Sequence, residues 1–324
     1  MSDSRSITPG FFAIHANHLE DLRRAVVYLC QQNPMSPLQQ ETFLVQSNGI
    51  AQWLKLALAE QSQAGGAGGL GIAASMEFLF PARFIWQAFR AVLADGEVPE
   101  QSPFDKRRLL WRLYRLLPQL VQSDDVFAPL ARFLQGHDAD ERVFQLAEKI
   151  ADLFDQYQVF RADWLAAWEP GDDIVINARG ERKLLPVESC WQPQLWRCLL
   201  DDVGSERSSR AHIHTRFMQQ GTVAAQPANP QRLPKRIVVF GVSSLPRQAL
   251  EALSVLSRFS QVVLCVHNPC QYFWADIISD RELLTASRRR AKLHPVLSTI
   301  DDPDTLHQYA NPLLAAWGKQ GRDY

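Results

Sequence analysis

One short stretch brings four polar side chains together directly after an apolar run at 43–45: Gln46, Ser47, Asn48 and Gln52. Their amides and hydroxyl can bind a ligand through hydrogen bonds. The apolar run is typical of a buried strand in a parallel sheet, and open α/β sheets bind ligands at the carboxyl ends of their strands. Ser47 or Asn48 can cap a following helix, with Gly49 relaxing the turn. An ordinary capped helix remains the simpler interpretation when this stretch is taken alone.

Two carboxylates, Asp152 and Asp155, lie about one turn apart on a helical pattern at 141–157. Carboxylates so placed can hold a metal ion or share acid–base work. No third ligand and no histidine lies nearby in the sequence, which favours a solvated helix face. His212 and His214 alternate rather than sharing a helix face, so the sequence does not indicate a zinc site there.

The glycine-rich segment 63–71, QAGGAGGLG, lacks the features of a phosphate-binding loop. Such a loop needs Gly-Lys-Ser/Thr, because the lysine meets the phosphates and the hydroxyl meets the magnesium. The Gly-Lys pair at 318–319 is followed by Gln320 instead. We therefore expect segment 63–71 to be a flexible surface loop. The basic cluster 288–292, RRRAK, is a candidate phosphate contact, although a solvated loop is the simpler interpretation.

Composition limits the class of protein. The 324 residues suggest about two domains, and a net charge of −1 gives no global basic field, so a nucleic acid would have to meet a local patch. The five cysteines have no C-x-x-C spacing, which predicts reduced thiols in a cytoplasmic protein. No signal segment or bilayer-length apolar run is found, so we expect no membrane partner. The abrupt end at Tyr324 suggests the front piece of a longer polypeptide.

A sheet built from both ends of the chain is expected to position the polar stretch. Helices are predicted at 19–30 with Asn17 as the cap, after Pro81, and from Ser243 to about Leu256. The pattern from 86 to 218 is helical, and the proline-rich segment 223–236 marks a boundary. The predicted domains are therefore an α/β domain of 1–85 and 222–324 and an all-helical insertion of 86–221. The predicted strands are 11–15, 43–45, 72–80, 237–242 and 261–267.

The predicted helical region is rich in tryptophan, with Trp164, Trp168, Trp191 and Trp196. Aromatic rings near basic residues can stack on the bases of single-stranded nucleic acid. Most such rings pack in a core instead, so we expect about one of the four to contact a ligand.

Several blocks together resemble one family. They occur in that family's order, span nearly the whole chain, and are not generic catalytic motifs. The family is RecC, the gamma subunit of bacterial exodeoxyribonuclease V (the RecBCD complex), of which this chain resembles the N-terminal part. The blocks are FLVQSNGIAQWL (43–54), FPARFIW (80–86), ADLFDQYQVFRADWLAAWE (151–169), GVSSLP (241–246), NPCQYFWADI (268–277) and NPLLAAWGKQGRDY (311–324).

The resemblance implies a superfamily 1 helicase-like fold, with a parallel sheet domain (1A), a helical domain (1B) and degenerate ATPase motifs. In that layout the phosphate loop follows the first strand, where this chain reads His15-Ala16-Asn17-His18-Leu19-Glu20. Glycines, lysine and hydroxyl are all missing there, and Glu20 would repel a triphosphate. The resemblance thus implies no cofactor in this fragment, with ATP and Mg²⁺ held by RecB-like and RecD-like partner subunits.

In the family, this subunit holds the complex together, splits duplex DNA ends, and scans the 3′-ended single strand for the recombination hotspot Chi. Amides can read base edges, aromatic rings can stack on bases, and arginines can meet phosphate or guanine. Asn48 and Phe80 depart from the family pattern, where threonine and leucine are expected, and segment 63–71 has no counterpart. The positions that match the family's Chi-recognition residues are Gln46, Asn48, Gln52, Phe80, Trp86, Asp152, Leu153, Asp155, Arg161 and Arg210.

Two other functions stay open. A purely structural module would assemble with partner subunits while all DNA contacts lie elsewhere in a longer chain. An active ATP-dependent helicase or nuclease would need a Lys/Thr phosphate loop and an acidic metal cluster, neither of which the sequence offers.

Overall fold

The computed structural model describes residues 7–36, 39–61, 68–93, 98–135, 139–177, 180–204, 209–270, 274 and 312–318. The chain divides into two compact units. The first comprises 1–81, 236–245 and 261–324, and the second comprises 82–235 and 246–260.

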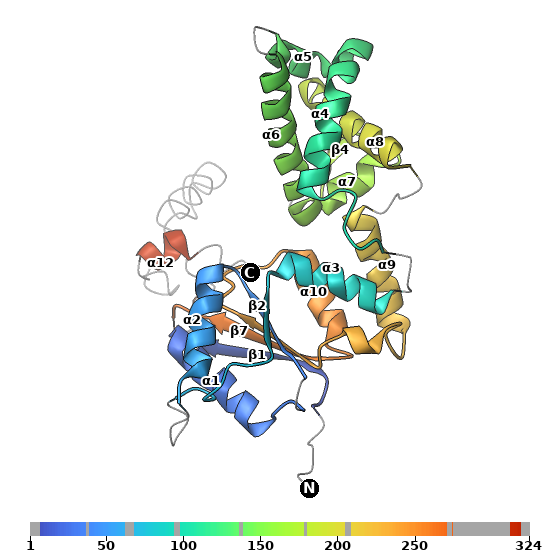
Figure 1. Cartoon of the computed structure of the whole chain (residues 1–324). Coiled ribbons are helices and arrows are strands. Elements are labelled where there is room, and N and C mark those ends of the chain that lie inside the picture. Colours follow the sequence, from blue (N-terminus) through green and yellow to red (C-terminus); the bar gives the residue numbers. More distant parts are fainter. Residues whose placement is uncertain are drawn as a thin grey trace, which may run out of the picture. The chain divides into compact units, whose positions relative to one another are not determined.

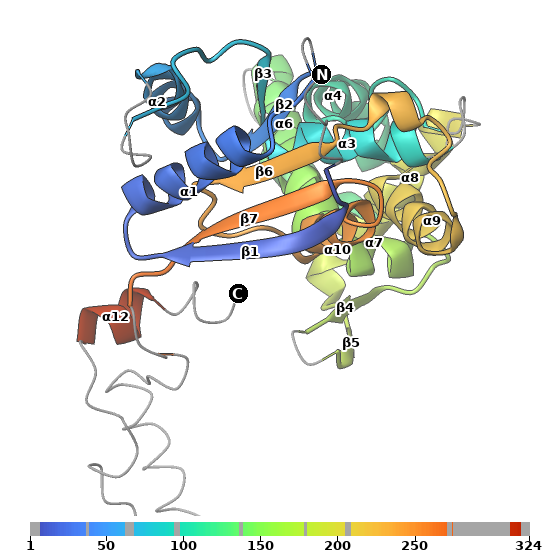
Figure 2. The same cartoon turned by 90° about the horizontal axis from the view of Figure 1, so that it is seen from below.

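The first unit contains a five-stranded parallel sheet in the order β1-β7-β6-β2-β3, and β1, β7 and β6 lie side by side in Figure 2. The prediction of an α/β fold, with one parallel sheet built from both ends of the sequence, is confirmed. Apolar β-branched runs explain the central strands, since all five residues of β6 and all five of β2 are buried. The strands are β1 (Gly10–Ala16), β2 (Glu41–Val45), β3 (Met76–Leu79), β6 (Arg236–Phe240) and β7 (Gln261–His267).

Two helices, α1 (Leu19–Gln32) and α2 (Asn48–Ala59), pack on the sheet and are labelled in Figure 1. Their apolar stripes form one cluster with alternate residues of three strands, which places both helices on one face. The strand residues in this cluster are Phe43, Val238, Phe240, Val263 and Cys265, and the fully buried helix residues include Leu22, Val26, Leu54 and Leu58. A short helix, α12 (Pro312–Trp317), also belongs to this unit.

The helix starts differ in part from the prediction. Ser47 caps α2, because its Oγ accepts a hydrogen bond from the backbone N–H of Ile50 at 3.3 Å. Gly49 is the second residue of α2 rather than part of a turn. Asn17 does not cap α1, since the N-cap residue is His18, whose side chain makes no capping bond. The carbonyl oxygen of Asn17 instead lies 3.0 Å from Nε2 of His267.

The end of the glycine-rich segment is packed rather than flexible. The N–H of Leu70 donates to the carbonyl of Leu58 at 2.7 Å, and that of Gly71 donates to the carbonyl of Glu60 at 2.8 Å. A Cβ on Gly69 would lie 2.5–2.7 Å from three backbone carbonyl oxygens at the end of α2. Because this segment is tied to α2, the predicted strand 72–80 shortens to β3. Residues 62–67 lie outside the described residues.

The Gly69→Ala variant is expected to lower the free energy of unfolding by about 1–3 kcal/mol, because the new methyl group meets backbone atoms that cannot rotate away. Urea denaturation measures this change. Gly49→Ala is the matched control, since a Cβ there meets only Ser47 Oγ at 3.8 Å. It should raise stability by about 0.5–1 kcal/mol through helix propensity. Equal effects of the two variants would contradict the packing described for Gly69.

The second unit is mainly helical. Its core is one buried cluster with two tryptophans at the centre, Trp168 and Trp196, both 0% exposed. Tyr157 and Trp164 pack against it. The helices are α3 (Pro81–Val92), α4 (Lys106–Ser123), α5 (Ala128–Leu134), α6 (Ala139–Phe160), α7 (Ala162–Trp168), α8 (Trp191–Val203), α9 (Arg210–Val223) and α10 (Arg247–Leu256), with 3₁₀ turns at Asp125–Phe127, Val187–Ser189 and Pro230–Arg232.

The insertion is not all-helical as predicted, because a small antiparallel hairpin joins α7 to α8. It pairs β4 (Ile174–Ile176) with β5 (Arg182–Leu184). Asn177 holds its turn, accepting from the N–H of Glu181 at 2.9 Å. The indoles of Trp168 and Trp164 donate to the carbonyls of Ile174 and Ile176, so the hairpin satisfies two buried donors of the helical core.

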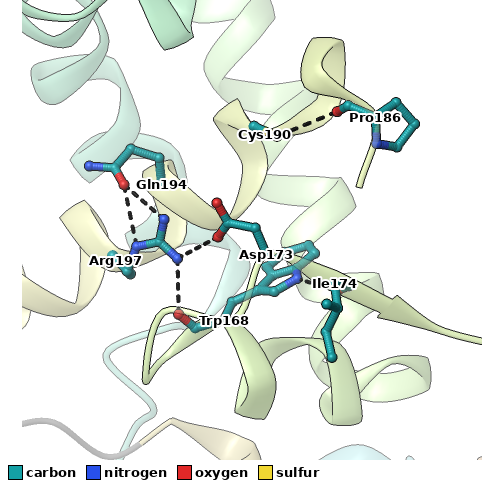
Figure 3. A network of polar contacts seen from close by, with 7 residues as sticks. All are labelled: Trp168, Asp173, Ile174, Pro186, Cys190, Gln194 and Arg197. Atoms are coloured by element: carbon teal, nitrogen blue, oxygen red, sulfur yellow. Dashed lines mark hydrogen bonds and ion pairs between the residues drawn. The ribbon is translucent and has the colours of Figure 1, made fainter. Parts of the chain in front are cut away.

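One arginine ties α8 to the segment that precedes the hairpin (Figure 3). Arg197 Nη1 donates to the carbonyl of Trp168 at 3.1 Å and to Oδ1 of Asp173 at 2.8 Å. Its Nη2 donates to Oε1 of Gln194 at 2.8 Å. These bonds use the fixed fork of the guanidinium and hold the C-terminal end of α7 beside α8.

The two units differ from the predicted domains in where 82–85, 222–235 and 246–260 belong. Helix α10 packs on α9, and Gly221 makes that possible because a Cβ there would collide with Val255. Arg258 also donates to the carbonyl of Gly221. The helix predicted from Ser243 begins at Arg247, after Pro246. Among the described residues, no helix has the length and apolar character that crossing a bilayer requires.

Candidate functional site

The polar stretch that follows β2 lies at the point of the parallel sheet where the strand order reverses. From β2 the next strand is β3, on one side, whereas from β6 the next strand is β7, on the other side. Strands β2 and β6 are neighbours, with Val45 paired to Phe240. Open α/β sheets bind ligands outside the carboxyl ends of two such strands. The carboxyl edge of the sheet, where β2, β3 and β6 end, is therefore the candidate site of the first unit.

Gln46 and Ser243 meet at this edge. Oε1 of Gln46 accepts hydrogen bonds from the backbone N–H of Ser243 at 3.3 Å and from its hydroxyl at 3.2 Å. The oxygen of the amide is therefore occupied, and the side chain is fixed across the ends of the two strands. Within the described ranges the amide nitrogen makes no hydrogen bond, so an exposed donor is presented at the site.

Three further predicted residues of the first unit are exposed. Asn48 begins α2, Gln52 lies one turn further along that helix, and Phe80 follows β3 with 45% of its surface exposed. Phe80 lies at the same edge of the sheet as Gln46, because β3 runs parallel to β2 and pairs Leu79 with Leu44. Amide groups and an accessible ring thus share one edge of the sheet, a place that the strand pattern predicted for the amide groups only.

The remaining predicted residues belong to the second unit, where the first of them, Trp86, is engaged in packing. It is partly buried on α3 and its Nε1 donates to the carbonyl of Pro99 at 3.1 Å. Its ring also meets Phe89 edge-on, with centroids 6.3 Å apart. A base that stacked on Trp86 would use only the part of the ring that stays accessible.

Asp152 on α6 is paired with a lysine that the sequence pattern did not single out. Lys106 Nζ lies 2.6 Å from Oδ1 of Asp152, and Gln156 Nε2 donates to Oδ2 at 3.1 Å. The lysine lowers the pKa of the Asp152 carboxyl, first through its hydrogen bond and then through its charge. Both carboxylate oxygens are therefore occupied, although the pair is about half exposed and open to competition from a ligand.

Asp155 and Arg210 form an electrostatic pair beside Asp105. Burial raises the pKa of the Asp155 carboxyl, and the nearby Arg210 charge opposes that shift. Burial likewise lowers the pKa of Arg210, against the charges of Asp155 and Asp105. Arg210 Nη2 donates to the carbonyl of Ala82 at 3.1 Å, which fixes the start of α9 against the start of α3. The interaction between Asp155 and Arg210 is therefore electrostatic, with no ion pair between these residues among the described contacts.

Arg161 lies between α6 and α7 and covers a tryptophan ring. Its Cζ is 5.1 Å from the centroid of the Trp164 ring, a cation–π geometry. Leu153 is partly buried on α6. Trp168 and Trp196 are core residues, so Trp164 and Trp191 are the members of the tryptophan group with accessible surface. All four tryptophans therefore belong to the helical core or pack against it, and Trp164 and Trp191 keep part of their surface accessible.

Four of the ten predicted residues lie in the first unit and six in the second, where Asp155 and Arg210 interact while Trp86 and Arg161 have separate partners. Three partners were missed: Lys106, Asp105 and Ser243. Ser243 carried the same signal as Gln46, a polar residue soon after a buried strand. Asp105 could have been found as the cap of α4, since its Oδ1 accepts from the N–H of Arg107 at 3.0 Å. Across the described ranges, no three His, Cys, Asp or Glu side chains converge as a metal site would require. The basic cluster 288–292 lies outside the described residues.

Comparison with known protein families gives one consistent match. The family model of the RecC N-terminal domain matches residues 11–324. The RecBCD enzyme subunit RecC of Escherichia coli (strain K12) is 36% identical over 326 residues, covering 96% of this chain and 27% of the relative. The subunit of the same name from Haemophilus influenzae is 35% identical, covering 97% of this chain and 30% of the relative.

A more distant relative, the RecBCD enzyme subunit RecC of Mycobacterium tuberculosis, is 27% identical over 284 residues. The chain spans only 23–30% of the length of these three relatives. The match covers both units, including the sheet edge with Gln46 and the helices that carry Asp152 and Arg210. The chain therefore belongs to the RecC family, and it corresponds to that family's N-terminal domain.

Proposed function

We propose that this chain is the N-terminal part of a RecC-like subunit of a RecBCD-type helicase–nuclease that acts in double-strand break repair and homologous recombination. In this proposal it is a non-catalytic, DNA-binding scaffold in the cytoplasm. It helps to split duplex ends and scans the 3′-ended single strand for Chi. Its partners are RecB-like and RecD-like subunits, duplex ends and single-stranded DNA.

The observation that carries the proposal is the chemistry at the reversal point of the sheet. The fixed amide of Gln46, the exposed amides of Asn48 and Gln52, and the ring of Phe80 share the edge at which α/β proteins bind ligands. Amides discriminate bases by paired donors and acceptors, and an exposed ring can stack on a base. A site of this composition suits an unpaired DNA strand better than a triphosphate.

The second part of the proposal is that the chain has a helicase-like core of domains 1A and 1B whose ATPase motifs are degenerate, so that it does not bind ATP. The turn after β1 would carry the phosphate loop, but it contains no glycine, lysine or hydroxyl residue. The first turn of α1 carries Glu20 and Asp21, whose charges oppose a phosphate at that helix N-terminus. ATP and Mg²⁺ would then act only in the partner subunits.

The test uses the full-length subunit assembled with its partners. Gln52→Ala and Asn48→Ala are expected to weaken the response to the hotspot about 5- to 100-fold, the usual cost of one base contact, while the unwinding rate is unchanged. Unwinding of a hotspot-containing duplex, with the position of strand cleavage as readout, measures both. Gln119→Ala, at an exposed amide on α4, is the matched control. An unchanged response in the Gln52 and Asn48 variants would leave the purely structural role.

An active ATP-dependent helicase is the opposing alternative. It predicts ATP hydrolysis by this chain alone, abolished by substituting Lys319, whereas the proposal predicts none. The purely structural alternative has support of its own, since Trp86 and Asp152 already have partners within the second unit. Those two residues are therefore weaker probes of base reading than Gln52.

A further inference from the structure

Three aromatic rings form a small exposed cluster on the second unit, where α4 and α6 lie side by side (Figure 1). Trp111 and Tyr114 come from α4, and Phe144 comes from α6. Their ring centroids are 6.0–6.3 Å apart in tilted and edge-on arrangements. Trp111 is 62% exposed and Phe144 is 38% exposed. We call Trp111, Tyr114 and Phe144 the aromatic patch.

The aromatic patch is built like the centre of a protein interface. Tyr114 packs on the buried core, so the rings stand on a rigid base and lose little freedom on binding. Trp, Tyr and Arg are the residues that most often dominate binding energy, and arginines flank Trp111 one turn away on either side, at Arg107 and Arg115. Asp202 binds Arg115, which holds that side chain in place.

The charges beside the aromatic patch favour a protein over a nucleic acid. On α4 the exposed charges are basic, whereas around Phe144 on α6 they are mainly acidic, with Asp140 and Glu148 one turn away on either side. The acidic side chains beside Phe144 would repel a phosphate backbone, whose binding depends on neutralisation by lysine and arginine. A folded protein surface can instead match both signs across one patch.

We propose that the aromatic patch is a docking site for another subunit of the assembled enzyme. The partner would offer an apolar pocket for Trp111, with acidic side chains facing α4 and basic side chains facing α6. The proposal rests on the proposed function, which makes this chain part of a multi-subunit enzyme. The relatives are named as subunits of the RecBCD enzyme, which implies other subunits as partners. Such an assembly has ample surface to cover two exposed rings.

The experiment measures the dissociation constant between the full-length subunit and its partner subunits by sedimentation. Trp111→Ala and Phe144→Ala are each expected to raise this dissociation constant at least about tenfold. Arg107→Glu, which keeps the rings, should also raise it, because it reverses a charge at the rim. Phe160→Ala is the matched control, since Phe160 lies at the other end of α6 with 65% exposure. It should change the constant less than about twofold.

Three outcomes would overturn the docking proposal while the wild-type subunits still assemble. An unchanged constant in both ring variants would do so outright. An unchanged dissociation constant, together with a lower melting temperature of the full-length ring variants, would assign the aromatic patch to a contact with the remainder of the same polypeptide. An unchanged constant with weaker, less salt-dependent binding of single-stranded DNA would assign it to nucleic acid. Failure of the wild-type subunits to assemble would overturn the proposed function itself.

Discussion

The Arg236→Met variant is expected to lose about 3–5 kcal/mol of unfolding free energy, because it leaves a buried carboxylate without its partner. Arg236 is 0% exposed, and its Nη1 lies 2.6 Å from Oε1 of Glu41. Its other nitrogens donate to the carbonyl of Asn33 and to Oε1 of Gln261, each at 2.7 Å. This arginine therefore joins β6 to β2, to the end of α1 and to β7. It lies at the amino-terminal end of β6, whereas the candidate site lies at the carboxyl ends of the strands.

The deficit of this variant should depend on pH. Burial raises the pKa of the Glu41 carboxyl even in the wild type, and Arg236 opposes that shift. Without the arginine the pKa rises further. A carboxyl with a raised pKa in the folded state stabilises the protein at low pH, and that contribution is lost as pH rises through the folded-state pKa. The Arg236→Met deficit should therefore shrink as the pH is lowered below neutrality, which urea denaturation at several pH values measures.

The double variant Arg236→Met, Glu41→Leu is the control. Replacing both members of a buried ion pair by apolar residues is often neutral, so most of the lost stability should return. A double-mutant cycle then gives the coupling between the two residues. A single-variant loss below about 1 kcal/mol, or no recovery in the double variant, would contradict the assignment of Glu41 as a buried, charge-paired group.

The sequence predicted the strands that short apolar runs of neighbouring residues specify. The apolar runs at 43–45 and 261–267 lie in strands as predicted, and the run predicted at 237–242 forms a strand that ends at Phe240. Short apolar runs of this kind are typical of strands in a sheet covered on both faces. The hairpin β4–β5 was missed because its strands are three residues long and β5 reads Arg-Lys-Leu. These strands contact the helical core, where their carbonyls accept hydrogen bonds from the indoles of Trp164 and Trp168, a tertiary interaction that no local pattern shows.

The candidate site divides in the same way. The polar edge of β2 could be predicted because a strand direction and a cap signal place those residues together. The partners of the charged residues could not, since Lys106 and Asp152 are 46 positions apart, and Arg236 and Glu41 are 195 apart. Asp152 therefore had no visible partner in the sequence, which favoured a solvated helix face, although it is paired with Lys106 in the fold. Which side chains remain free to meet DNA is decided by tertiary contacts.

The Trp196→Ala variant is expected to destabilise the second unit by about 3–5 kcal/mol, the usual cost of removing a buried tryptophan. Trp196 is fully buried, with its ring 5.1 Å from Phe104 and 5.4 Å from Phe154 between centroids. Thermal unfolding followed by circular dichroism measures the loss. Helix α6, which carries Asp152, packs in this core through Phe154, so DNA binding by the assembled enzyme should fall only above the lowered melting temperature. A loss below about 1 kcal/mol would contradict the packing.

Phenylalanine substitutions separate packing from hydrogen bonding in the same core. Trp168 and Trp196 are both 0% exposed, but only the indole of Trp168 has an acceptor, the carbonyl of Ile174 at 2.7 Å. Among the described residues, Nε1 of Trp196 is buried without a partner. Trp168→Phe should therefore lower the free energy of unfolding by about 1–3 kcal/mol more than Trp196→Phe does. Trp168→Phe leaves the carbonyl of Ile174 without its donor, whereas Trp196→Phe removes an indole N–H that has no partner. Equal losses would mean that the hairpin adds nothing to the stability of the helical core.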